Sequence, residues 1–480
     1  MESQQSGKIT GRVSPLVHLS SNLLSRIGVV LVTTAVVLWI ILLPVTLHLQ
    51  EHPYLGMITF LFLPGLFFLG LVLIPLGILL RRRRERRGGV YPGEFPPLDF
   101  KNVKLRRMLA FVGVTTVANV MIGLLFFYAG VRYMDGVTFC GRTCHTVMSP
   151  EFTAYVRSPH ARVECVQCHI GPGASWFVKS KISGTYQVLA VIFNLYPRPI
   201  STPIHDLRPA RDTCERCHWP EKFTGDLLEV KTKFGDDEKN ARTRTVLLMH
   251  IGGLDADRKL VGIHGRHLGL VTYIASDAKR QVIPWVSYRN ADGSVSEYVS
   301  TDAPPTTEQL ERGERRLMDC IDCHNRPSHR FDLPENAVNQ AMAAGQISSA
   351  LPFAHKISIE LLKKDYATKL AAQTEVPEAF REYYRKNYFP TYNAQRAQVE
   401  QAAATLLEIY NVNVFPSMNL TWGTYPSNIG HTDSPGCFRC HDGSHQTKAG
   451  QDISQDCNSC HSLLAMDEEN PKILQELYEK

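Results

Sequence analysis

The cysteines of this chain are grouped in a pattern that could do chemistry. All 12 lie after residue 139, and each pair of them is followed directly by a histidine. Five pairs have the form C-x-x-C-H, and a sixth, Cys140 to Cys144-His145, has one extra residue between its cysteines. In chain order after that first motif come Cys165/Cys168-His169, Cys214/Cys217-His218, Cys320/Cys323-His324, Cys437/Cys440-His441 and Cys457/Cys460-His461.

This spacing is the signature of covalent attachment of a c-type haem. Two thiols three positions apart reach neighbouring vinyl groups of a porphyrin, and the histidine that follows reaches the iron from one face. Zinc sites, disulfides and redox-active pairs also use closely spaced cysteines, but none of them requires a histidine after every second cysteine. The pattern therefore predicts six c-type haems, the first of them held by a wider loop.

Histidines outside the motifs are candidates for the second axial ligand of each iron. Nine of them lie beyond residue 139, enough for two histidines on each of five irons. The sequence context makes three of the nine the weakest candidates for this role: His205, His250 and His355. We expect the ligands among His160, His264, His267, His329, His431 and His445.

The first motif has a different neighbour. Met148 follows His145 by three residues, one helical turn, so both side chains lie on the same side of the iron. Either Met148 replaces His145 as a ligand, or it packs beside the haem as an apolar neighbour. A thioether ligand raises the reduction potential of the iron.

Three long apolar stretches precede the motifs: Ile27–Leu49, Tyr54–Leu80 and Met108–Gly130. Each is long enough to cross a hydrocarbon layer of about 30 Å as a helix, at about 1.5 Å per residue. Buried helices of a soluble protein, or a signal peptide for the first stretch, are the alternatives. A signal peptide has a shorter apolar region and a small-residue cleavage site, which are not present here.

Basic residues predict the orientation of these spans. An arginine-rich run begins at Arg81, and further basic residues follow up to Arg107, whereas the link between the first two spans has none. The positive-inside rule places residues 1–26 and the loop 81–107 in the cytoplasm. Everything after residue 130 then lies on the periplasmic side of a bacterial inner membrane.

Charge argues against a nucleic-acid partner. Residues 1–130 carry 13 basic and 5 acidic side chains, a balance of +8, so the remainder carries −2 of the total of +6. A protein that binds nucleic acid places its basic excess on the folded domain. The lipid bilayer is the partner that these residues predict.

The segment beyond residue 130 has an irregular organisation. Residues 131–223 hold three motifs with little room for an apolar core, which the haems would have to supply, and residues 311–480 hold the other three. Between them, residues 224–310 alternate in polarity with an Asn290-Ala-Asp-Gly turn, which predicts a small antiparallel β insert. The fold class is thus three transmembrane helices (27–130) plus a mainly α or irregular, haem-packed periplasmic domain.

The chain resembles the NapC/NirT family of membrane-anchored multihaem quinol dehydrogenases. The resemblance is closest over residues 139–223. It includes Cys144-His-Thr-Val-Met-Ser-Pro-Glu151, Ser158-Pro-His160, His169-Ile-Gly-Pro-Gly173 and Arg208-Pro-Ala-Arg211 before the third motif. This chain departs from the short members of the family in having three spans and six motifs instead of one span and four haems.

The resemblance implies Met148 as a ligand of the haem nearest the membrane, and a quinol pocket beside that haem. Lys181 is then the candidate base or hydrogen-bond donor, with Lys179 as second choice, and either lysine is otherwise only interfacial. Electrons from the membrane quinol pool would pass along the haems to a periplasmic cytochrome or reductase. The alternative is a terminal reductase of a small oxyanion, which needs an iron with an open position, and no C-x-x-C-K motif is present.

Overall fold

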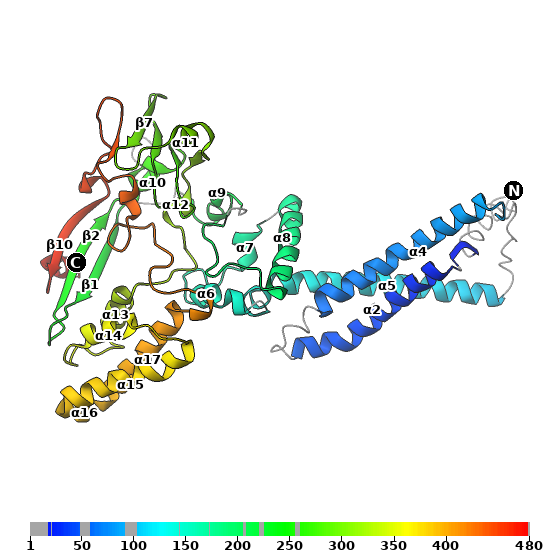
Figure 1. Cartoon of the computed structure of the whole chain (residues 1–480), viewed down its shortest axis with the longest axis horizontal. Helices are drawn as coiled ribbons and strands as arrows, with labels where there is room; N and C mark the ends of the chain where they lie inside the picture. Colours follow the sequence, from blue (N-terminus) through cyan, green and yellow to red (C-terminus); the bar gives the residue numbers. More distant parts are fainter. Residues whose placement is uncertain are drawn as a thin grey trace. The chain divides into compact units, whose positions relative to one another are not determined.

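The computed structural model describes residues 18–20, 22–48, 58–91, 103–143, 145–171, 173–204, 208–219, 225–254 and 260–478. The chain divides into two compact units, Met1–Met148 and Ser149–Lys480. Figure 1 labels the elements of each.

The first unit is built of long apolar helices. They are α2 (Leu23–His48), α4 (Leu63–Arg87), which the short π-helix η1 (Ile58–Phe62) precedes, and α5 (Val103–Asp135). Three stretches, Leu23–Leu42, Leu63–Arg87 and Val117–Asp135, are long and apolar enough to cross a membrane. The prediction of three candidate spans is confirmed.

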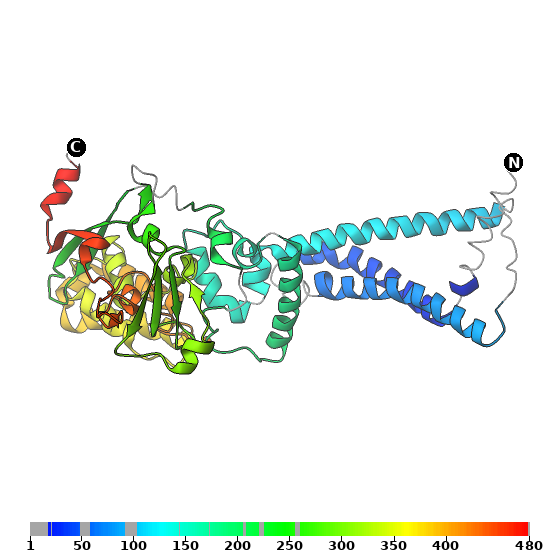
Figure 2. The same ribbon diagram turned by 90° about the horizontal axis from the view of Figure 1, so that it is seen from above.

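Helices α2 and α4 lie side by side (Figures 1 and 2) and approach closely because small residues face each other. A Cβ atom added at Gly28 would come within 2.7 Å of the Gly70 carbonyl oxygen, and the reverse substitution meets the same limit. Small residues allow this kind of backbone contact between membrane helices. Trp39 adds a buried hydrogen bond from its indole nitrogen to the Thr59 carbonyl (2.7 Å) and stacks on Phe126.

Six further helices of the described residues follow α6 (His145–Val156) before the fourth motif ends. They are α7 (Cys165–His169), α8 (Ala174–Ile192), α9 (Ala210–Cys214), α10 (Gly262–His267), α11 (Thr307–Arg312) and α12 (Cys320–Cys323). After the fourth motif, a cluster of longer helices forms: α13 (Pro334–Ala343), α14 (Ala354–Lys363), α15 (Lys369–Asn387), α16 (Phe389–Ala394) and α17 (Arg396–Asn413).

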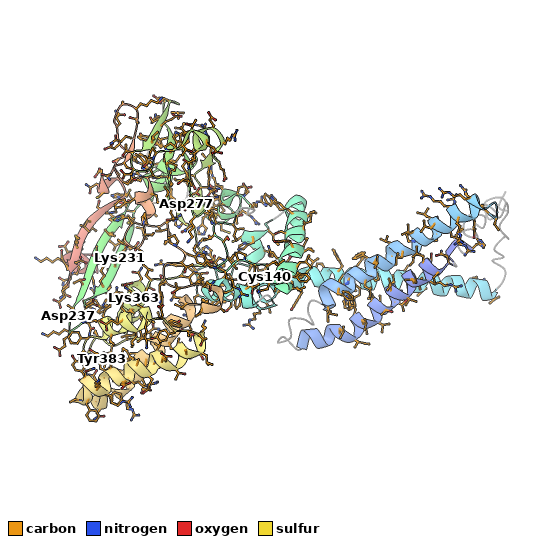
Figure 3. The ribbon with its side chains drawn as sticks, viewed as in Figure 1. Cys140, Lys231, Asp237, Asp277, Lys363 and Tyr383 are labelled. Atoms are coloured by element: carbon orange, nitrogen blue, oxygen red, sulfur yellow. The ribbon has the colours of Figure 1, made fainter. Side chains whose placement is uncertain are left out.

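This helical cluster holds the largest apolar core of the described residues. Leu351, Leu362, Phe380 and Leu406 are all fully buried in it. Figure 3 labels Tyr383 of α15 and Lys363 of α14, on two of its helices.

Among the described residues of the second unit, ten strands form antiparallel sheets. A three-stranded sheet has the order β1-β2-β10, a five-stranded sheet the order β8-β5-β6-β7-β9, and β3 pairs with β4. Their bounds are β1 Leu227–Phe234, β2 Arg242–Met249, β3 Gly253–Leu254, β4 Leu260–Val261, β5 Val271–Ile274, β6 Trp285–Arg289, β7 Val295–Ser300, β8 Arg316–Leu317, β9 His445–Gln446 and β10 His461–Glu468.

The sheets differ from the self-contained insert that we predicted over residues 224–310. Strands β8, β9 and β10 come from later in the chain and complete the sheets, because unpaired strand edges need partners. The 262–267 segment, which follows β4, is helix α10. The last helix is α18 (Lys472–Tyr478).

Candidate haem-binding site

Motifs two to six lie on short helical turns of the second unit. Their cysteines belong to, or follow within three residues, α7, α9, α12, the 3₁₀ turn η5 (Gly436–Arg439) and the 3₁₀ turn η6 (Cys457–Ser459). A single turn brings residues i and i+3 to one face, so both thiols of a motif point the same way. None of the eleven described cysteines forms a disulfide.

Each histidine of motifs two to six faces a histidine from another segment. In all five pairs one ring belongs to a motif and the other does not. The pairs, with the distances between ring centres, are His169–His329 (6.2 Å), His160–His218 (6.0 Å), His264–His324 (6.3 Å), His267–His441 (5.9 Å) and His431–His461 (6.3 Å).

This distance is what two axial ligands of one iron require. A metal–imidazole bond is about 2 Å long, and each ring centre lies about 1 Å behind its nitrogen, which places the two centres about 6 Å apart. A bare metal ion such as zinc needs three or four protein ligands. In the described ranges no group of three or more His, Cys, Asp or Glu side chains is placed to hold one. The residues therefore fit a porphyrin-bound iron.

Hydrogen bonds orient several of these rings. Nδ1 of His264 lies 2.6 Å from the carbonyl oxygen of Ile251, and Nδ1 of His441 lies 2.6 Å from that of Ser454. A carbonyl oxygen only accepts, so Nδ1 carries the hydrogen and the lone pair is on Nε2. Carbonyl partners of this kind fix the tautomer of metal-binding histidines.

Burial also favours the neutral form that can coordinate a metal. It lowers the pKa of His324, and the neighbouring His264 acts in the same direction. Burial likewise lowers the pKa of His169, with His329 again adding to the effect. A neutral imidazole is the coordinating form, so His324 and His169 are favoured in the form that can bind an iron.

His329 is held by a half-buried ion pair. Its Nδ1 donates to the Glu151 carbonyl (3.0 Å), and the Glu151 carboxylate accepts two hydrogen bonds from Arg326, at 2.9 and 2.7 Å. The Arg326 guanidinium also lies 4.0 Å from the centre of the Tyr425 ring. Sequence reasoning did not single out Arg326 or assign a role to Glu151, because nothing local connects residues so far apart in the chain.

A second network joins the fourth and fifth motifs through the residues between their cysteines. The buried Asp322 carboxylate accepts hydrogen bonds from Tyr273 (2.8 Å) and Arg316 (2.7 Å). Arg439 donates to the Asp322 carbonyl (2.8 Å) and, with another nitrogen, to the Arg280 carbonyl (2.9 Å). The variable positions of these two C-x-x-C segments thus fix the two motifs relative to each other.

Motifs two, three and four adjoin one another. Burial raises the pKa of Cys168, and Cys165 and then Cys217 of the third motif act in the same direction. The thiols of Cys214 and Cys320 hydrogen-bond to each other, which raises the pKa of Cys214 and lowers that of Cys320.

Motifs four, five and six continue this sequence. Burial raises the pKa of Cys323 to about 11, and Cys437 of the fifth motif adds to the effect. Burial also raises the pKa of Cys460 in the sixth motif, and Cys437 again contributes. Motifs two to six therefore follow one another in space in the order of the chain.

Helix α10 serves two motifs at once. His264 and His267 are one turn apart, but His264 pairs with the fourth motif and His267 with the fifth. The ring of His267 is fixed by the Ile263 carbonyl (2.7 Å from Nδ1).

Three further histidines have other partners. His445, predicted as a ligand, is buried, with one ring nitrogen 2.8 Å from an Asp442 carboxylate oxygen and the other 2.7 Å from the Ile283 carbonyl. The structure therefore does not bring His445 to a motif, because β9 carries it into the five-stranded sheet. His250 contacts Asp226 and Ser462, His355 contacts Asp236, and His205 lies outside the described residues.

The first motif belongs to the first unit. Cys140 lies in the π-helix η2 (Phe139–Thr143), where its thiol is 3.8 Å from the Met134 carbonyl oxygen. Met148 is half-buried on α6. Cys144 and the side chain of His145 lie outside the described part of the chain.

The two lysines proposed for quinol chemistry both lie on α8 of the second unit. The Lys179 ammonium is 5.1 Å from the centre of the Trp176 ring. Lys181 is half-buried, and its carbonyl accepts a hydrogen bond from the Thr185 hydroxyl (2.9 Å).

Comparison with known proteins gives one curated relative of high similarity. The chain is 44% identical over 424 residues to the cytochrome c-type protein ImcH of Geobacter sulfurreducens, which covers 88% of this chain and 83% of that protein. No protein-family model matches the chain, and no solved structure matches it.

Proposed function

The chain belongs to the family of the cytochrome c-type protein ImcH, and on that premise we propose that it oxidises membrane quinol and delivers the electrons to a periplasmic acceptor. The acceptor is a soluble cytochrome or a reductase. Multihaem electron transfer follows from the family, and the source and destination of the electrons are our proposal. We place the protein in the bacterial inner membrane, with the second unit on the periplasmic side, as an extended NapC/NirT-type quinol dehydrogenase.

The five histidine pairs are the observation that carries this proposal. We assign the motif cysteines as the attachment points of six c-type haems, and the paired histidines as both axial ligands of haems two to six. Haem supplies reversible one-electron chemistry when bound. An iron with histidine on both faces has no open position for a substrate. The pairs therefore favour electron transfer over reduction of a small oxyanion.

The protein's own residues set the order of the sites. Motifs two to six adjoin in chain order. The hydrogen bonds around the Asp322 and Glu151 carboxylates hold neighbouring haem sites at fixed separations. For the first site we propose Met148 as a ligand, with Cys140, Cys144 and His145 completing it. Lys181, or Lys179 in its place, accepts or donates the quinol proton.

The test uses the full-length, haem-loaded protein in proteoliposomes with a quinol analogue. We expect Met148→Ala and Lys181→Gln each to slow haem reduction by quinol by roughly tenfold or more, with the same total haem reduced by a chemical reductant. Lys386→Gln, at an exposed position of α15, is the matched control and should behave as wild type. Unchanged quinol kinetics in both variants would reject the site.

Iron and pyridine haemochrome analysis of the same preparation counts the haems. Six per chain is the expected value, and five would remove the first, wider motif from the assignment.

A further inference from the structure

Helix α8 exposes a continuous apolar stripe. Val178, Ile182, Tyr186, Leu189 and Phe193, which directly follows the helix, are 55%, 69%, 66%, 48% and 66% exposed. Their spacing of three or four residues places them on one face of a helix. Contiguous exposed apolar surface of this kind marks a contact with a membrane or a partner.

Helix α8 touches the rest of the protein beside the stripe, near its two ends. Ala190 is buried and Trp176 is half-buried, and neither belongs to the apolar stripe. The stripe itself therefore stays exposed while both ends of the helix are in contact with protein.

Charge around the stripe suits an anionic surface. Lys179 and Lys181 lie at its two edges, and Arg198 follows the helix. Residues 165–205 contain no aspartate or glutamate, although the second unit as a whole is slightly acidic. Lysines that flank an apolar face keep their ammonium groups at the level of lipid headgroups while their stems lie along the acyl chains.

The chain itself supplies the surface. Its three candidate membrane spans tether the second unit to a bilayer. Helix α8 has 19 residues, but it carries Lys179 and Lys181 and is not among the candidate spanning helices. Its pattern is that of a helix that lies in the plane of the membrane interface.

We propose that α8 and the exposed Phe193 and Leu195 after it lie in the headgroup region of an anionic bilayer, with the Val178–Phe193 stripe in contact with acyl chains. This would dock the second unit on the membrane through a contact separate from the transmembrane helices. The proposal goes beyond quinol oxidation, since the docking does not require Lys181 or Lys179 to touch quinol.

The experiment uses full-length, haem-loaded protein in nanodiscs that contain phosphatidylglycerol. A photoactivated carbene reagent dissolved in the acyl chains labels residues that reach the lipid, and peptide mass spectrometry locates the label. We expect the peptide with Ile182 and Leu189 to be labelled roughly fivefold or more above the peptide with Leu370. Leu370 is the matched reference, because it is 74% exposed but isolated on α15.

Two comparisons make the result specific. In nanodiscs of neutral lipid the labelling of α8 should fall, because the lysines lose their anionic partners. Ile182→Asn with Leu189→Asn should lower labelling of the rest of α8, whereas Leu370→Asn should not. The haem absorption spectrum shows whether each variant has assembled. If the double variant has not assembled, the comparison of anionic with neutral lipid for the wild-type protein still tests the proposal.

Labelling of α8 at the level of Leu370 would overturn the proposal. A stripe covered by a second copy of the chain would also overturn the proposal. That result would appear as two chains per nanodisc for the wild type and one chain per nanodisc for the double variant. An excess of quinol analogue should leave the labelling unchanged, and label that the analogue displaces would report a quinol pocket instead. Failure of lipid contact is thus distinguishable from failure of quinol oxidation.

Discussion

The helices α13–α17 and the segments that carry motifs two to six belong to the same compact unit, but they bury their side chains in different ways. The helical cluster is closed by its own residues, with Leu351, Leu362, Phe380 and Leu406 fully buried. From residue 149 to 233, in contrast, the buried apolar side chains of the described part are Ala154, Tyr155, Ala190 and Ala210.

The difference follows from what each region contains. No cysteine motif falls between residues 325 and 436, and there the chain uses Leu, Phe, Tyr and Ala at helical spacing. The motif segments instead contribute paired histidines and cysteines, which leave space between them. We infer that the haems complete the core of the motif region, whereas the helical cluster is stable without them.

The strongest test of this contrast removes one motif. Cys214→Ser with Cys217→Ser eliminates one attachment site, so we expect one haem fewer per chain and a loosened motif region. Limited proteolysis should cut residues 149–325 roughly tenfold faster, while a fragment containing residues 334–413 persists. Equal protection of both regions in the variant would remove the distinction between them.

The converse change acts on the helical cluster. Phe380→Ala removes a fully buried ring that packs against Tyr384, with ring centres 5.1 Å apart, and should lower the stability of the cluster by about 3–5 kcal/mol. Thermal unfolding followed by protease resistance of residues 334–413 measures it, with Leu370→Ala as the exposed control. The haem absorption spectrum should not change, and a changed spectrum would mean that the two regions are not independent.

A smaller, local effect is expected from a single ligand. His160→Ala removes one ring of the His160–His218 pair, so about one sixth of the haem should change from low-spin to high-spin. His445→Ala is the control, because His445 is held by Asp442 and Ile283 in the sheet. Electron paramagnetic resonance distinguishes low-spin from high-spin haem in each variant. A high-spin signal from the His445 variant alone would reverse our ligand assignment.

The smallest effect concerns Lys369 at the start of α15. Burial lowers its pKa from 10.5 to about 8, and its ammonium donates to the Asn411 carbonyl at 2.7 Å. Between these pH values the unfolded chain binds more protons than the folded one, so stability should rise with pH. The full shift would give about 3 kcal/mol, and solvent that reaches the half-buried ammonium reduces the expected rise to about 1 kcal/mol. The melting temperature of the cluster measures this. Lys369→Met should abolish the rise and Lys364→Met, at an exposed position, should retain it.

Much of the site was predictable from local patterns. The motif cysteines and histidines follow from spacing that chemistry imposes within a few residues, and the three apolar stretches follow from membrane thickness. His160, His264, His267, His329 and His431, which we predicted as ligands, each face a motif histidine in the structure. Their assignment to particular irons stays a proposal.

The pairing itself could not be predicted, because proximity along the chain is misleading here. His160 precedes the second motif but faces the third, and His431 precedes the fifth but faces the sixth. His445 is four residues after His441 and faces neither motif, since β9 turns it into the sheet. Long-range packing decides these contacts, and a single sequence contains no local signal for it.

The pairing of His169 with His329 has a consequence for how the protein is made. A chain that leaves the cytoplasm from its N-terminal side presents the second motif long before it presents His329. If that site holds a haem on the periplasmic side, as we propose, its iron has one face open until the segment with His329 follows. The proposed assignment thus implies an interval of maturation with an incomplete site, and a chain truncated before residue 329 would never complete it.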